Sequence, residues 1–149
     1  MRKAALVVAA LCCLPAGSCS RPAALDPGTV LVILPGGQQI RAELLTRPED
    51  MMRGMMFRDS LPPDRGMLFV HTAPGRYTYW MHQCLIPLDI IWMDANRRIV
   101  EISPDTPPCR TEASQCPHYG GNRESQYVLE LAGGMAAKYG LKLGDVISF

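Results

Sequence analysis

The sequence predicts a β-rich α+β fold, a single compact domain with about eight short strands and two short helices. Short runs of aromatic and β-branched residues recur along the chain, and Gly, Pro, Asn and Asp separate them. Only two short segments carry helical signals. Hydrophobic residues make up 48% of the 149 residues, which is enough apolar material for a packed core. A small barrel is one closed form that such strands adopt.

Residues 1–18 have the features of a signal peptide, with a basic pair after Met1 and an apolar run over residues 4–14. Small residues precede Cys19 and resemble a bacterial lipobox, whose cysteine becomes the lipidated start of the mature chain. We therefore expect a lipid anchor at Cys19 and a tether over residues 19–28, which place the protein on the periplasmic side of a bacterial envelope membrane. Ordinary secretory cleavage, giving a soluble periplasmic or secreted protein, is the alternative.

The cysteines that remain after export predict one disulfide. They are Cys19, Cys84, Cys109 and Cys116, and a lipid on the first leaves an odd number of thiols in an oxidising compartment. Cys109 and Cys116 share one irregular, proline-bearing loop that has no core of its own. We predict that these two pair and that Cys84 stays free.

The folded domain, residues 29–149, is predicted to begin with a β-hairpin. Residues 29–34 and 39–45 are β-rich or alternate apolar and polar side chains, and Pro35-Gly36-Gly37 forms the turn between them.

A short helix is predicted from Thr46 to Met56. Thr46 and Glu49 have the spacing of a capping box, in which the two side chains satisfy free N–H groups at the helix start. Gly54 weakens this helix by about 1 kcal/mol relative to Ala, so we expect it to admit a close neighbour.

Strands dominate the rest of the predicted domain. They are expected at residues 67–71, 76–81, 88–93, 99–102, 127–131 and 146–149. Residues 104–121 are expected to form a long loop, and residues 134–139 a second helix of one or two turns that ends at Gly140.

Charge and hydropathy exclude two broad classes. The formal net charge is +1, with 15 basic and 14 acidic residues and no run of like charges, so nothing predicts nucleic-acid binding. No apolar run reaches the length of a membrane-spanning helix.

Charged residues beside apolar ones indicate a candidate pocket. Asp89 lies in a hydrophobic strand, where a carboxylate needs a partner, and Arg53 and Arg58 are candidates for a bidentate pair. Trp80 offers an aromatic platform for a sugar or a peptide. A structural ion pair and ordinary core packing are the simpler explanations of the same residues, and Glu130 admits the same two interpretations. The candidate set is Arg53, Arg58, Trp80, Met81, Asp89 and Tyr119.

A metal site is the weaker alternative. His82, Cys84 and His118 are candidate ligands, and thiolate and thioether groups suit Cu(I). The spacing matches no tight metal signature, and the four methionines within residues 51–56 are also explained as adaptable core filling. Cys84 beside His82 is a formal nucleophile and base, but no oxyanion-hole motif accompanies them.

Motifs spread over the predicted domain resemble a known family. They are Arg53-Gly54-Met55-Met56-Phe57-Arg58, Leu61-Pro62, Gly66-Met67-Leu68-Phe69, Trp80-Met81, Pro87-Leu88-Asp89-Ile90, Cys116-Pro117-His118-Tyr119, Val128-Leu129-Glu130 and Gly144-Asp145. In this order they resemble the domain-of-unknown-function 192 family over roughly residues 29–149. The resemblance implies a compact, β-rich and often exported domain, and no established reaction. His82, Gln83 and Cys84 stand where Lys-Asn-Thr is typical, so no role is carried over to those positions.

These observations predict a class of function and no particular reaction. We expect a cell-envelope lipoprotein, a small non-enzymatic module that binds a small ligand or an envelope protein and contacts the membrane through its lipid. No cofactor is expected. One alternative is an envelope enzyme that uses Asp89 with Arg53 or Arg58, and the other is a soft-metal (copper) binding protein.

Overall fold

The structure is a computed structural model that describes residues 25–149. The predicted signal peptide and the predicted lipidation site, Cys19, lie outside the described residues. Within them, no helix is both long and apolar enough to cross a bilayer.

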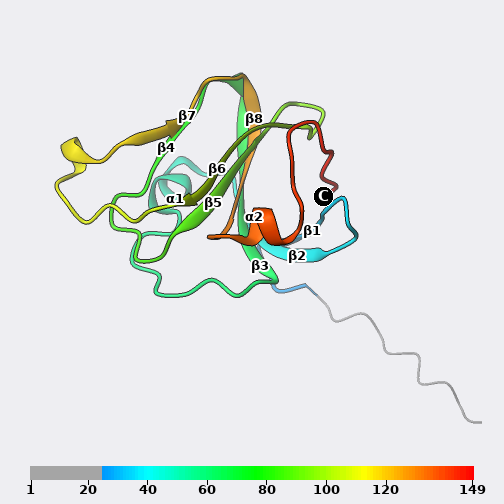
Figure 1. The fold of residues 1–149 in the computed structure, drawn as a ribbon, viewed down its shortest axis with the longest axis horizontal. Coiled ribbons are helices and arrows are strands. Elements are labelled where there is room, and N and C mark those ends of the chain that lie inside the picture. The colour runs from blue at the N-terminus through cyan, green and yellow to red at the C-terminus, as the bar shows by residue number, and fades with distance from the viewer. Residues whose placement is uncertain (1–24) are drawn as a thin grey trace, which may run out of the picture.

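A six-stranded sheet forms the body of the domain (Figure 1). In spatial order its strands are β1 (Thr29–Ile33), β2 (Gln39–Leu45), β3 (Arg65–Gly75), β8 (Ser125–Ala132), β5 (Leu88–Met93) and β6 (Ile99–Thr106). Neighbouring strands are antiparallel except β2 and β3, which are parallel. The predicted β-rich α+β class, with eight strands and two short helices, is confirmed.

The sheet does not close into a barrel, because its edge strands β1 and β6 do not pair with each other. The C-terminal segment, predicted as a strand over residues 146–149, makes isolated bridges instead. Ser148 pairs with Ile33 at the end of β1, and Val146 pairs with Arg98 just before β6. This segment therefore reaches both edges without forming a continuous ladder.

A second, two-stranded sheet pairs β4 (Thr78–Trp80) with β7 (His118–Gly120). The sequence predicts only a loop over residues 104–121, so β7 was missed. Gly120 has a φ of +78°, and a Cβ there would lie 2.2 Å from the Trp92 ring. This pairing depends on a close approach that only glycine permits.

The helices are shorter than predicted. They are α1 (Pro48–Arg53), α2 (Met135–Lys138) and the 3₁₀ turn η1 (Ala113–Gln115). The capping box predicted for Thr46 and Glu49 is wrong, because α1 begins at Pro48 and no side chain caps it. The Arg47 guanidinium instead pairs with Glu49 and Asp50, at 2.8 and 3.0 Å.

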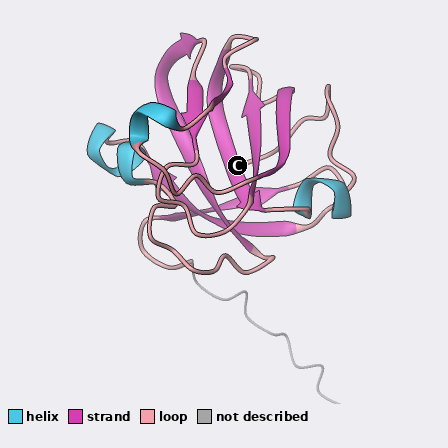
Figure 2. Ribbon diagram, turned by 60° about the vertical axis from the view of Figure 1, so that its left-hand side comes forward, coloured by secondary structure: helices cyan, strands magenta, loops and turns pink. Residues whose placement is uncertain are grey.

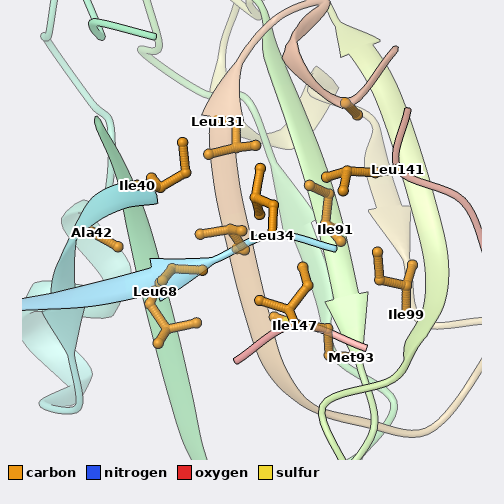
Figure 3. Packing of buried hydrophobic residues seen from close by; sticks show 13 residues of the cluster. Leu34, Ile40, Ala42, Leu68, Ile91, Met93, Ile99, Leu131, Leu141 and Ile147 are labelled. Atoms are coloured by element: carbon orange, nitrogen blue, oxygen red, sulfur yellow. The ribbon is translucent and has the colours of Figure 1, made fainter. Parts of the chain in front are cut away.

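Two hydrophobic clusters cover the two faces of the large sheet. Leu68, Ile91 and Leu129 point to one face, and their neighbours Phe69 and Ile90 point to the other. Figure 3 shows the first cluster, to which α2 and the C-terminal segment contribute. The second cluster lies beneath α1 and the β4–β7 ribbon, so the two short helices lie on opposite sides of the sheet (Figure 2). Burial of both faces explains why every residue of β5 is buried.

Candidate functional site

An open groove of about 430 Å³ lies between α1 and the strands β3 and β4. Its volume is within the range of small-molecule sites, and most of its surface is apolar. Methionines from α1 form one side, and aromatic residues of β3, of β4 and of the turn between them form the other. The lining residues are Thr46, Pro48, Met51, Met52, Val70, His71, Thr72, Tyr77, Thr78, Tyr79 and Trp80.

The aromatic side of the groove is an uncharged wall whose side chains contact one another. The His71 ring stacks on Tyr77 with ring centres 3.4 Å apart, and His71 Nε2 lies 3.1 Å from Tyr79 Oη. Burial lowers the pKa of His71 and raises the pKa of Tyr79, so both are neutral at pH 7. The wall offers ring faces and one hydrogen-bonding pair.

A smaller chamber of about 30 Å³ adjoins the groove, with which it shares Met51, Met52, Tyr79 and Trp80. Glu130 of β8 lines the chamber. This residue is 4% exposed, and its Oε2 has no hydrogen-bond partner in the described part of the chain. Burial raises the pKa of Glu130 to about 8, against the opposing effect of the Arg58 charge. The carboxyl is therefore mostly protonated at pH 7, and a buried acid left without a partner is typical of functional positions.

Cys84 also lines this chamber and is buried with a free thiol. Burial, reinforced by Glu130, raises the pKa of Cys84 to about 12, so the thiol is protonated at pH 7. A thiolate nucleophile with His82 as its base is therefore not what this environment favours.

The structure does not pair Asp89 with an arginine. Asp89 is fully buried, and its oxygens accept hydrogen bonds from the backbone N–H groups of Asp105 at 2.6 Å, Gly134 at 3.1 Å and Ala136. The carboxylate thus holds the start of α2 and the end of β6. The sequence could not show this, because the donors are backbone amides far along the chain.

Arg58 pairs with Glu43 of β2 instead. Its Nη1 and Nη2 donate to the two carboxylate oxygens, with Nη2 to Oε2 at 2.8 Å, and the hydrogen bond raises the pKa of Arg58. The prediction that Asp89 pairs with Arg53 or Arg58 is therefore wrong.

The other residues of the predicted pocket also lie in different parts of the fold. Trp80 lines both the groove and the chamber, and the exposed Arg53 lines the chamber. Met81 is fully buried in the core, where its carbonyl accepts hydrogen bonds from the N–H groups of Cys84 and Cys109. Tyr119 pairs across the small sheet with Tyr79. Only Trp80 of the six predicted residues thus lines the groove.

Of the predicted metal ligands, His82 and Cys84 both line the chamber, and His118 does not. His82 and His118 lie against the Trp80 ring, at 5.1 and 5.8 Å between ring centres, and Cys84 lies in the core. Over residues 25–149, no three His, Cys, Asp or Glu side chains lie close enough to hold a metal ion. Cys109 and Cys116 form a disulfide in the structure, as the sequence predicts.

Sequence reasoning missed the groove because its walls come from separate elements. Nothing in the sequence shows that His71 stacks on Tyr77, or that both face the methionines of α1. Glu130 carried a signal, since an acid within the apolar run Tyr127–Leu131 is expected to be buried. Its missing partner appears only in the structure.

The sequence profile of one protein family matches residues 31–149 of this chain. The chain belongs to the DUF192 family. That family is described as an uncharacterised ACR, so membership in it names no reaction. No curated protein matches the chain.

Two solved structures resemble this DUF192 domain. One is a protein of unknown function from Novosphingobium aromaticivorans DSM 12444, with a TM-score of 0.75 and 31% identity over 85% of this chain and 91% of that one. The other is titled a putative transcription regulator from Sinorhizobium meliloti 1021, with a TM-score of 0.70 and 28% identity over 80% of this chain and 91% of that one. Both likenesses agree with the fold described above.

Proposed function

We propose that this protein is an exported, membrane-anchored module that binds a small, uncharged and largely apolar ligand. The groove between α1 and β4 is the observation that carries this proposal. No Asp, Glu, Lys or Arg side chain is among its lining residues in the described structure, so an ionised ligand would lose hydration there without gaining a charged partner.

The chemistry of the two sides supports this ligand class. Trp80 and Tyr77 contribute aromatic rings to the lining, which suit a planar or extended apolar body. Met51 and Met52 lie opposite on α1, and their unbranched thioether chains adapt to ligands of different shape. The hydrogen-bonded pair of His71 and Tyr79 supplies the few polar atoms that orient such a ligand.

The proposed location follows from the N-terminal sequence and from the cysteines. A basic start, an apolar run and small residues before Cys19 support export and lipidation. A disulfide between Cys109 and Cys116 suits an oxidising compartment.

A variant pair at one position tests the groove. Thr72 is an exposed lining residue of β3, so Thr72→Trp fills the groove while Thr72→Val, its control, leaves it open. The full protein is purified from its native envelope, and bound small molecules are released and identified by untargeted mass spectrometry. We expect one compound class to accompany the wild type and Thr72→Val, and to fall at least tenfold in Thr72→Trp. Equal amounts in all three, or none with the wild type, would contradict the proposal.

A further inference from the structure

We propose that the small chamber beside the groove binds a soft monovalent metal ion, of which Cu(I) is the biological example, through Met55, Met56 and Cys84. The chamber adjoins the groove, but the three proposed ligands are not among the residues that line the groove. It also differs from the His82, Cys84 and His118 set considered from the sequence, because methionine sulfur supplies most of its donors.

The donor atoms are the first argument. Four methionines, one cysteine and one histidine are among the residues that line a single chamber of about 30 Å³. Thioether and thiol sulfur bind Cu(I) in preference to hard cations such as Mg²⁺ or Ca²⁺. Met55 is 2% exposed and Cys84 is 5% exposed, so two of the proposed ligands are already shielded from water.

The backbone brings these donors together. Met56 and Cys84 face each other in an isolated antiparallel bridge, and Phe57 N–H donates to the Gln83 carbonyl at 2.9 Å. Phe57 and Gln83 have φ values of +64° and +56°, which non-glycine residues rarely adopt. Strain of this kind persists only where the surrounding structure maintains it, and it gathers at binding sites.

The size of the chamber selects its occupant. A volume of about 30 Å³ holds one ion or one or two water molecules, and it excludes an organic ligand. Gly54 and Phe69 both line the chamber, and a Cβ at Gly54 would lie 3.3 Å from the Phe69 ring, so a larger residue would crowd this wall.

An unsatisfied oxygen in the chamber supports a bound cation. Glu130 Oε2 is buried at the chamber wall and has no hydrogen-bond partner among the described residues, whereas Arg53, which also lines the chamber, is exposed to solvent. When the ion binds, a metal–sulfur bond forms at Cys84 and the thiol proton passes to solvent. No electron is transferred, so no oxidant or reductant is needed.

Silver(I) tests this proposal without a reducing agent, so the Cys109–Cys116 disulfide stays intact. The full protein is titrated with silver nitrate in chloride-free buffer, and native mass spectrometry and calorimetry give stoichiometry and affinity. The variants are Cys84→Ser and the double change Met55→Leu with Met56→Leu. The control is Met93→Leu with Met135→Leu, on the opposite face of the sheet. Swaps of Met for Leu conserve volume and keep the fold.

We expect one silver ion per protein, bound at least tenfold more weakly in both chamber variants and unchanged in the control. Binding that needs Cys84 but ignores Met55 and Met56 would reduce the site to a lone thiol and overturn the proposal, as would no binding to the wild type. If a variant fails to fold, methyl NMR of the wild-type protein with labelled methionines provides a test that needs no substitution. Silver should shift the Met55 and Met56 methyl signals, and unmoved signals would equally overturn the proposal.

Discussion

Replacing Asp89 should destabilise the fold severely, because its carboxylate serves three backbone amides at once. The acceptor oxygens hold the N–H groups of Gly134 and Ala136 at the start of α2, and the N–H of Asp105 in β6. Asp105 has a φ of +46°, a conformation that needs such support. Each buried amide left without a partner costs about 1–3 kcal/mol. Asp89→Ala should therefore lower the free energy of unfolding by about 3–5 kcal/mol.

Asp89→Asn separates the charge from the geometry. The amide keeps one oxygen acceptor but points an NH₂ group at N–H donors, so we expect a loss of about 2–3 kcal/mol. The exposed Asp59 gives the matched control, and Asp59→Ala should change stability by less than about 0.5 kcal/mol. Urea unfolding at pH 7 measures all four proteins. If the free energy of unfolding of Asp89→Ala lies within about 1 kcal/mol of the wild-type value, as for most surface variants, the structural role assigned to this carboxylate is wrong.

Three further predictions concern the anchor, the disulfide and the buried acid. Cys19→Ala should release the protein from membrane fractions, and sedimentation that survives a high-salt wash would argue against lipidation. Peptide mapping without reductant should recover Cys109 joined to Cys116, and replacing both by Ala should cost about 2–3 kcal/mol, whereas Cys84 found in a disulfide would contradict this pairing. Glu130 holds its proton in the folded state up to a pKa of about 8 but loses it near 4.5 when unfolded. Stability should therefore fall as pH rises between these values, by at most about 1.4 kcal/mol per pH unit, and Glu130→Gln should flatten this decline in a pH series of urea unfolding curves.

A strand could be predicted from the sequence where a proline or a turn motif marks each of its ends. β5 spans Leu88–Met93 as predicted, because Pro87 precedes it and a turn at Asp94-Ala95-Asn96 follows it. β7 has three residues, and its pairing with β4 depends on contact between Gly120 and the distant Trp92 ring. No local pattern carries such a contact.

The candidate site was less predictable, because its chemistry depends on partners rather than on residue type. Burial of Asp89 followed from its apolar strand, but an arginine partner did not, since backbone amides of α2 were equally able to satisfy a carboxylate. Glu130 has a similar sequence context, but its Oε2 has no hydrogen-bond partner within residues 25–149. Two acids in similar hydrophobic runs thus differ in role for a reason that only the tertiary fold contains.

Methyl NMR on the intact protein with labelled methionines tests the proposed groove most directly. Met51 and Met52 line the groove, whereas Met93 and Met135 pack on the opposite face of the sheet. Small molecules extracted from the native envelope are added to the labelled protein. We predict that the Met51 and Met52 methyl signals shift while those of Met93 and Met135 stay in place. Shifts confined to the opposite face, or no shift at any methionine, would contradict a ligand in this groove.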